Sequence, residues 1–283
     1  MKAKLLHFNE LVMMGHSIFS FPFIFIAMIV ASGGWFGFEL LFLGALAAFT
    51  ARNFAMSFNR YVDRDIDALN ERTQSRPSVD GRIKSREVLL FMALNALGFI
   101  VVAYFINSLA FKLAFPILLV LAAYSYFKRF SESAHLILGF TLALAPIAGA
   151  IAVSQTIPYW SVMLAIGVMF WVAGFDILYS LQDMEFDKKM GLFSVPSRFG
   201  ASKSLLIAES FHILTIAFWI IFAIQAELGL FGYLAVVFSA GMLTYEHSLV
   251  RQDFGKIDRA FFTVNGYLGI VFLGFIILDR LFA

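Results

Sequence analysis

The chain has 283 residues, of which 61% are hydrophobic and only 14% charged, and its mean hydropathy is +0.84. Soluble domains carry about a quarter charged residues, so this composition excludes an ordinary water-soluble protein and makes lipid the solvent for most of the surface. The net charge of +2 gives no reason to expect a nucleic-acid partner. No cysteine occurs, which excludes disulfides, iron–sulfur ligation and thiolate zinc sites.

Long stretches without Asp, Glu, Lys or Arg predict membrane-spanning helices, since one span needs only about 20 apolar residues. We expect nine, at residues 10–32, 38–60, 87–107, 110–128, 133–153, 158–181, 204–225, 228–249 and 260–281. A secretory signal is the competing interpretation of the first, because ASGG resembles a small-residue cleavage site. Its apolar run is longer than the roughly 7–15 residues of a signal core, so we favour a span.

Positive charge predicts the orientation of these spans. Of the 21 Lys and Arg, 18 lie at the N-terminus or in and beside the connections around 61–86, 128–132, 182–203 and 250–259. The positive-inside rule places those segments, and the N-terminus, in the cytoplasm. We therefore expect a multi-pass protein of the inner (plasma) membrane.

A first acidic strip follows the second predicted span. Asn59, Asp63 and Asp67 are four residues apart, a spacing that stacks side chains along one face of a helix. Carboxylate and amide oxygens on one strip repel each other unless a cation lies between them, and they suit a hard ion such as Mg²⁺. A solvated loop start with incidental acids is the alternative.

A second acidic pair, Asp183 and Asp187, repeats the four-residue spacing at the end of another predicted span. Arg52 precedes Asn59 by seven residues, and Asp176 precedes Asp183 by seven, so each helix carries an ionisable group about 10 Å deeper. We interpret this as a weak internal repeat, with acidic motifs near 59–67 and 183–187, inside a single transmembrane domain over residues 1–283. Two opposed strips could hold Mg²⁺ ions that bind the phosphate oxygens of a substrate.

Polar groups near both acidic segments are candidates for binding a diphosphate. They are Arg72, Arg76, Tyr124, Lys128, Lys188 and Arg198. Tyr124 and Lys128 are four residues apart in YSYFKR, where an interfacial aromatic with a snorkelling lysine is the alternative. The five histidines lack the close spacing of a metal-binding pair and are expected to be structural or interfacial.

Three motifs in order, N-x-x-x-D-x-x-x-D in NRYVDRDID, Y-x-x-x-K in YSYFK and D-x-x-x-D in DMEFD, resemble the UbiA superfamily of intramembrane aromatic prenyltransferases over essentially the whole chain. The words RNFAMSFNR, NERTQSRP and GLFSVPSRFG are most similar to its 4-hydroxybenzoate polyprenyltransferases. Many ubiquinone-pathway members have Asp directly after the motif Asn, whereas this chain has Arg60. A sister group with the same pattern is thought to prenylate 1,4-dihydroxy-6-naphthoate in a menaquinone route.

The resemblance implies an all-α membrane protein with nine transmembrane helices around a central cavity. Mg²⁺ held by Asn59, Asp63, Asp67, Asp183 and Asp187 would neutralise the diphosphate of a polyprenyl diphosphate, with the candidate donors named above beside it. Arg52 and Asn59 would orient the aromatic acceptor, and Asp176 would accept a hydrogen bond from its hydroxyl. A structural ion pair between Arg52 and Asp176 is the alternative.

Two other classes fit the composition. An ion-coupled transporter also places Asp and Arg in the membrane, but near its midplane rather than at its cytoplasmic end. A structural or assembly protein of the membrane would not need two matching acidic strips. Within the enzyme class, a lipid, haem or chlorophyll precursor is the alternative acceptor.

Overall fold

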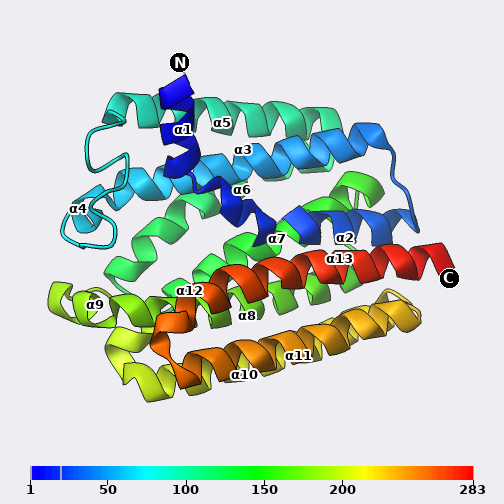
Figure 1. The fold of residues 1–283 in the computed structure, drawn as a ribbon. Coiled ribbons are helices and arrows are strands. Elements are labelled where there is room, and N and C mark those ends of the chain that lie inside the picture. The colour runs from blue at the N-terminus through cyan, green and yellow to red at the C-terminus, as the bar shows by residue number, and fades with distance from the viewer. Residues whose placement is uncertain (1, 20, 283) are drawn as a thin grey trace. The chain divides into compact units, whose positions relative to one another are not determined.

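The computed structural model describes residues 2–19 and 21–282, and within these ranges every regular element is helical (Figure 1). The α-helices are α1 Lys2–Leu11, α2 Phe21–Ser32, α3 Phe38–Val62, α4 Arg64–Asp67, α5 Ser85–Ile106, α6 Ser108–Ala123, α7 Ala134–Ser154, α8 Tyr159–Ser180, α9 Met184–Met190, α10 Val195–Gln225, α11 Leu230–Gln252, α12 Ile257–Arg259 and α13 Asn265–Phe282. Short 3₁₀ helices are η1 Met14–Phe19, η2 Tyr124–Arg129, η3 Leu181–Asp183 and η4 Phe254–Lys256, and η5 Ala260–Val264 is a π-helix.

Within residues 2–19 and 21–282, seven helices are long and apolar enough to cross a membrane. They begin at Phe38, Ser85, Ser108, Ala134, Tyr159, Val195 and Phe254, and each matches one predicted span. The predicted span at 228–249 is also a helix, α11, but it carries the buried Glu246 and His247 and is not among the seven. The all-helical, multi-pass prediction is confirmed, while two of the nine predicted spans lack a helix that meets these criteria.

The prediction of one continuous helix over residues 10–32 is wrong. Helix α1 ends at Leu11, Met13 adopts a left-handed backbone conformation (φ 45°), and α2 begins only at Phe21. A non-glycine residue with positive φ cannot continue a right-handed helix. The apolar pattern did not reveal this break, because residues 11–32 contain no Asp, Glu, Lys or Arg.

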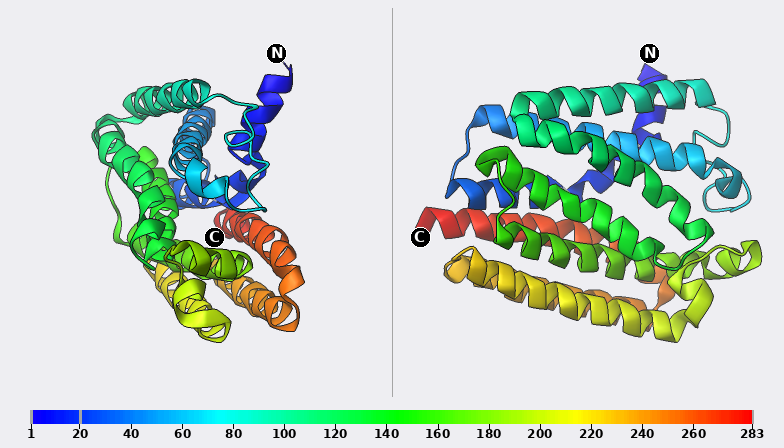
Figure 2. Two further views of the ribbon diagram at one scale, coloured as in Figure 1. Left: turned by 90° about the vertical axis from the view of Figure 1, so that its left-hand side faces the viewer. Right: turned by 180° about the vertical axis from the view of Figure 1, so that it is seen from behind.

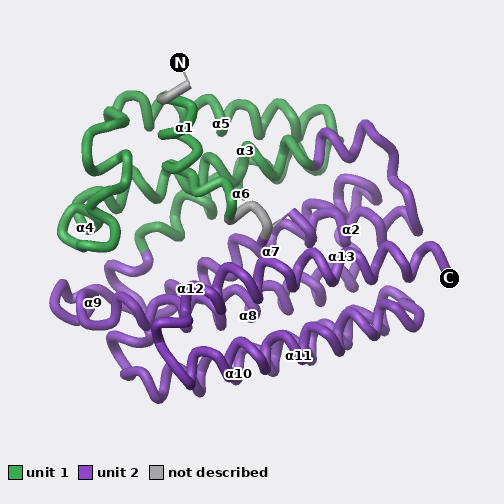
Figure 3. The backbone as a smooth tube through the Cα atoms, in the orientation of Figure 1, with its two compact units in different colours: residues 1–17, 45–126 green, residues 18–44, 127–283 purple. Residues whose placement is uncertain are grey.

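The chain forms two compact units, coloured separately in Figure 3: residues 1–17 with 45–126, and residues 18–44 with 127–283. In the first unit, α3, α5 and α6 share a core of small and aromatic side chains, among them Phe54, Phe99, Ala114 and Leu121. Each unit contains one of the two acidic motifs.

The second unit is built around α8, which packs against both α7 and α10 (Figure 2). Trp171 and Trp219 are fully buried there, and the Phe23 ring lies 5.1 and 5.6 Å from theirs. Helix α7 approaches its neighbours closely at two glycines: a Cβ on Gly139 would lie 2.2 Å from the Met169 carbonyl oxygen, and one on Gly149 would lie 2.4 Å from that of Ile24. Small residues allow such backbone contact in membrane helices.

The segment 182–203, predicted as a loop, is largely helical. It contains η3, α9 and the first turns of α10, which bends at Gly200 (φ 78°, ψ 168°). Glycine adopts this conformation without steric cost. Helix α10 therefore begins at Val195, about two turns earlier than the apolar pattern predicted.

Candidate active site

The first acidic strip lies at the junction of α3 and α4. The Asp63 amide donates to the Asn59 carbonyl and the Asp67 amide to the Asp63 carbonyl, each at 2.8 Å, so the helical bonding of α3 runs on into α4. Asn59 and Asp63 are therefore one helical turn apart, as the sequence predicts, and Asp67 ends α4 beyond the non-helical torsions of Asp63 (φ −87°, ψ 3°). Asp63 and Asp67 are only 2% and 4% exposed. The alternative interpretation, a solvated loop start with incidental acids, therefore does not apply to these two residues.

Side-chain hydrogen bonds tie this strip together. Asn59 Nδ2 donates to Asp63 Oδ2 at 2.7 Å, and Arg60 Nη1 donates to Asn59 Oδ1 at 3.1 Å. Arg76 Nη1 lies 2.6 Å from Asp67 Oδ2 in an ion pair. Of the predicted diphosphate-binding residues, Arg76 is thus brought directly to the strip. Charge-assisted hydrogen bonds of this kind are about twice as strong as neutral ones.

The two terminal nitrogens of Arg52 differ in their hydrogen bonding. Its Nη2 donates to the main-chain carbonyl of Met13 at 2.7 Å. That carbonyl is available because the chain leaves the helical conformation at Met13. Nη1 is buried and has no hydrogen-bond partner among the described residues. A buried guanidinium nitrogen without a partner is costly, so this atom is suited to a ligand oxygen.

Asp176 lies on α8 beside a residue that sequence reasoning missed. His135 Nδ1 is 2.7 Å from Asp176 Oδ2, and His135 Nε2 accepts the Val195 amide proton at 3.1 Å. Since Nε2 is the acceptor, the ring proton is on Nδ1 and points to the carboxylate. Val195 opens α10, whose first amides need acceptors. No sequence motif includes His135. Its only distinguishing feature in the sequence is its position just after the basic FKRFSES segment.

The second acidic pair lies at the start of the short helix α9 and within it. Asp183 is its N-cap residue, and Gly191, in a left-handed conformation (φ 67°), ends it. The Asp187 carboxylate is close enough to Asp183, Lys128 and His135 to interact with all three electrostatically. The structure thus brings the predicted Lys128 to this pair, within the second unit.

The other predicted donors are less closely placed. Lys188 Nζ pairs with Glu185 at 2.9 Å on an exposed surface, and the Arg72 and Arg198 side chains are exposed. Tyr124 and Lys128 both fall in η2. In a 3₁₀ helix residues i and i+3 share a face rather than i and i+4, so the register assumed for this pair is absent.

Residues 20–275 match the UbiA prenyltransferase family. The chain belongs to this family. It is therefore a multi-pass membrane prenyltransferase, and neither an ion-coupled transporter nor a purely structural protein.

Two relatives of this prenyltransferase are bacterial 4-hydroxybenzoate octaprenyltransferases. The protein of Herminiimonas arsenicoxydans is 29% identical over 258 residues, which cover 90% of this chain and 89% of that protein. The protein of Marinobacter nauticus is 31% identical over 251 residues, which cover 88% and 85%.

Solved structures show the same fold. The apo structure of a UbiA homologue from Aeropyrum pernix K1 has a TM-score of 0.85 at 28% identity, covering 93% of this chain and 98% of that one. A UbiA homologue from Archaeoglobus fulgidus, solved bound to DMAPP and Mg²⁺, has a TM-score of 0.78 at 18% identity, covering 98% and 99%.

The donor chemistry of this prenyltransferase fits Mg²⁺. Across the described ranges, no three acidic or histidine side chains lie close enough together to hold a metal ion. Each unit does present oxygen ligands at a four-residue spacing, Asn59, Asp63 and Asp67 in one and Asp183 and Asp187 in the other. Neither set includes sulfur, and oxygen-only ligands are those that Mg²⁺ prefers.

Proposed function

We propose that this prenyltransferase transfers a polyprenyl group from polyprenyl diphosphate to the ring of 4-hydroxybenzoate in respiratory quinone biosynthesis, with Mg²⁺ as cofactor. The observation that carries the proposal is the buried, unpartnered Nη1 of Arg52. An aromatic acid offers the carboxylate that this guanidinium suits. The names of the bacterial relatives support the same acceptor.

The acidic residues of both units would bind the leaving group. Asn59, Asp63 and Asp67 with Asp183 and Asp187 would hold Mg²⁺, which supplies positive charge to the departing diphosphate. Arg76 already forms an ion pair with Asp67, and Lys128 interacts electrostatically with Asp187. Together with Arg72, Arg198, Lys188 and Tyr124 they would donate hydrogen bonds to the phosphate oxygens.

Asp176 and His135 would act on the acceptor. The His135 Nδ1–H bond fixes the position of the Asp176 carboxylate, which is 24% exposed and keeps its other oxygen for a ligand. A carboxylate that accepts the hydrogen bond of a phenol raises the electron density of the ring. The allylic carbon–oxygen bond breaks to release diphosphate, and the ring carbon bonds to the resulting allylic cation. The ring proton then passes to the released diphosphate, which restores aromaticity.

A second acceptor, 1,4-dihydroxy-6-naphthoate, is favoured by Arg60. This residue stands directly after the motif Asn, is 5% exposed and donates to the Asn59 side-chain oxygen. An acidic residue at this position could not donate that bond. Arg60 therefore changes which part of Asn59 faces a ligand, and with it the shape and charge of the acceptor end.

Competition between acceptors tests the proposal. Inner membranes containing the protein would be incubated with radiolabelled polyprenyl diphosphate, Mg²⁺ and equal amounts of 4-hydroxybenzoate and the naphthoate. We expect label in the prenylated 4-hydroxybenzoate. Label only in the naphthoate product would show that the naphthoate is the acceptor and that the reaction class is correct. Label in neither product would contradict both proposed acceptors.

A further inference from the structure

Met13, in the connection between α1 and α2, contacts two arginines of α3. Its carbonyl oxygen accepts a hydrogen bond from Arg52 Nη2 at 2.7 Å, and its Sδ atom lies 3.0 Å from Arg60 Nη2. All three residues belong to the first unit. Because eight residues of an α-helix span about 12 Å, this one methionine links two levels of α3, one at Arg52 and the other beside the acidic strip.

The backbone of Met13 directs its carbonyl to Arg52. Within a continuing α-helix this carbonyl would accept from the amide four residues ahead. Met13 has a φ of 45°, which ends the right-handed helix, and its carbonyl bonds to α3 instead. Residues other than glycine rarely adopt this left-handed conformation, and where they do, the surrounding structure holds it in place. The contact with Arg52 therefore depends on an unusual torsion.

Contacts on the α1 side hold Met13 in this conformation. Its amide donates to the Glu10 carbonyl at 3.1 Å. The Glu10 carboxylate accepts from Arg82 at 2.6 and 2.8 Å, and the Phe8 ring stacks on the Phe91 ring at 4.8 Å. Helix α1 is thus fixed to α5 and to the segment that precedes α5, and Met13 is fixed with it.

The Met13 side chain is held in turn by Arg60. A thioether is a weak acceptor, but Arg60 is only 5% exposed, and buried N–H groups need a partner. Arg60 also donates through Nη1 to Asn59 Oδ1 at 3.1 Å. The chain of contacts therefore runs from the acidic strip through Arg60 and Met13 to Arg52.

Attachment to Met13 determines which nitrogen of Arg52 is left for a ligand. The guanidinium is planar, so fixing Nη2 at the Met13 carbonyl also fixes the direction of Nη1. That atom is buried and has no hydrogen-bond partner among the described residues. If the Met13 carbonyl moved, the guanidinium could rotate, and Nη1 would lose its defined direction.

We propose that Met13 is a positioning residue for the aromatic acceptor: its left-handed backbone holds Arg52 so that Nη1 faces the acceptor carboxylate. The inference rests on the acceptor-binding role proposed for Arg52. Both candidate acceptors carry a carboxylate, so it applies to either of them. Acceptor binding should then depend on how readily residue 13 adopts the left-handed conformation.

A series of substitutions at residue 13 tests this dependence. Met13→Gly, Met13→Asn, Met13→Ala and Met13→Val all remove the thioether, and their preference for a left-handed backbone falls in that order. In nanodiscs, KM for the acceptor that the competition experiment identifies should rise along the series, about tenfold from glycine to valine. KM for polyprenyl diphosphate should stay unchanged. The other three variants still give the order if the valine variant does not fold, and an equal acceptor KM across the folded variants would overturn the proposal.

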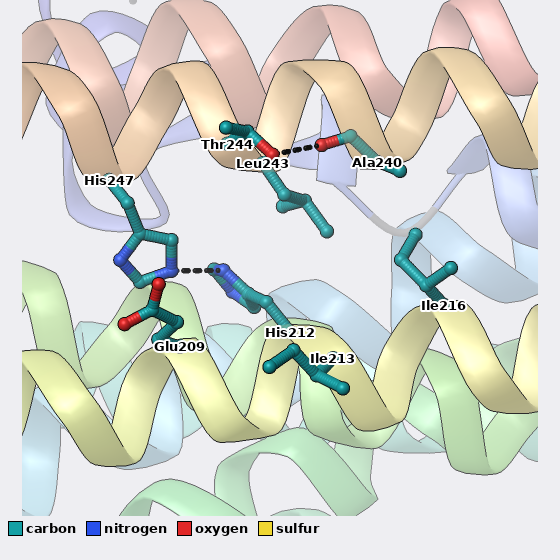
Figure 4. A pocket seen from close by; sticks show the side chains of 8 residues that line it. All are labelled: Glu209, His212, Ile213, Ile216, Ala240, Leu243, Thr244 and His247. Atoms are coloured by element: carbon teal, nitrogen blue, oxygen red, sulfur yellow. Dashed lines mark hydrogen bonds between the residues drawn. The ribbon is translucent and has the colours of Figure 1, made fainter.

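A double-mutant cycle separates positioning from a purely structural role. If Met13 acts through Arg52, Met13→Val should raise the acceptor KM no further in an Arg52→Ala background, whereas an independent effect on the fold would add to it. Thr244→Val is the control in the second unit, since it also removes a hydrogen bond to a main-chain carbonyl, that of Ala240 at 2.8 Å (Figure 4). The control should leave both KM values unchanged.

The roles of Arg52 and Met13 can fail separately. An acceptor KM that Arg52→Ala leaves unchanged would contradict the role proposed for Arg52. A rise with Arg52→Ala but none along the Met13 series, or additive effects in the cycle, would overturn the role of Met13 alone.

Discussion

The Nδ1 atom of His135 lies 2.7 Å from Oδ2 of Asp176, while its Nε2 accepts the amide proton of Val195 at the start of α10. One imidazole thus joins three helices of the second unit and fixes a carboxylate that is partly open to a ligand. This relationship makes His135 a positioning residue, and its contribution can be measured separately from that of Asp176.

Replacing His135 should slow the reaction without weakening polyprenyl diphosphate binding. We expect His135→Ala to lower kcat about 10- to 100-fold, the value of a hydrogen bond to a charged group, with little change in KM for the diphosphate. His135→Asn keeps an N–H near the Nδ1 position and should restore part of the rate. If the alanine variant loses stability and the asparagine variant restores stability but no activity, His135 has only a structural role.

Arg52→Ala should act on the aromatic acceptor. Loss of the guanidinium removes the partner for the acceptor carboxylate, so KM for 4-hydroxybenzoate should rise about tenfold or more. The affinity for polyprenyl diphosphate should stay nearly unchanged. Arg52→Lys keeps the charge without the paired donors and should fall between the two. Equal losses for both substrates would mean that Arg52 serves the fold through the Met13 carbonyl.

The close approach of α8 and α10 predicts different outcomes for two glycines. Gly174→Ala would place a methyl group 2.3 Å from His212 Nε2, and overpacking of this kind costs about 1–3 kcal/mol. Gly241→Ala on α11 meets no atom within 4 Å and gains helix propensity of up to about 1 kcal/mol. Thermal unfolding in detergent should show a lower Tm for the first variant and an unchanged or higher Tm for the second.

How much of this could be predicted depended on the range of the interactions. Seven of the nine predicted spans and the one-turn spacing of Asn59 and Asp63 are local features, so apolar run length and four-residue spacing were sufficient to predict them. The break at Met13, the kink at Gly200 and the contact of His135 with Asp176 depend on residues 39–60 positions away or on backbone torsions. Sequence periodicity cannot predict these features, because the hydrogen-bond partner of a carbonyl or an imidazole depends on which residues the tertiary fold places beside it.

The orientation in the membrane can be tested with single cysteines, since the chain has none. Positive charge places the exposed Gln74 in the cytoplasm, and seven predicted spans before Glu227 place that residue outside. A membrane-impermeant maleimide added to intact cells should label Glu227→Cys and leave Gln74→Cys unlabelled. Labelling in the opposite sense would invert the topology. Labelling of neither position, or of both, would mean that an even number of spans, rather than the predicted five, separates residues 74 and 227.

The most direct test of the account is prenyl transfer by purified protein in nanodiscs as Mg²⁺ is varied, for wild type, Asp63→Asn and Asp183→Asn. Each substitution removes one carboxylate charge from one unit and keeps the shape of the side chain, and circular dichroism would verify the helices. The account predicts that EDTA abolishes transfer by the wild type and that Mg²⁺ restores it. Each variant should lose at least about 100-fold in rate, as expected when charge stabilisation of the leaving group is lost. Transfer at the wild-type rate by either folded variant, or in EDTA, would contradict it.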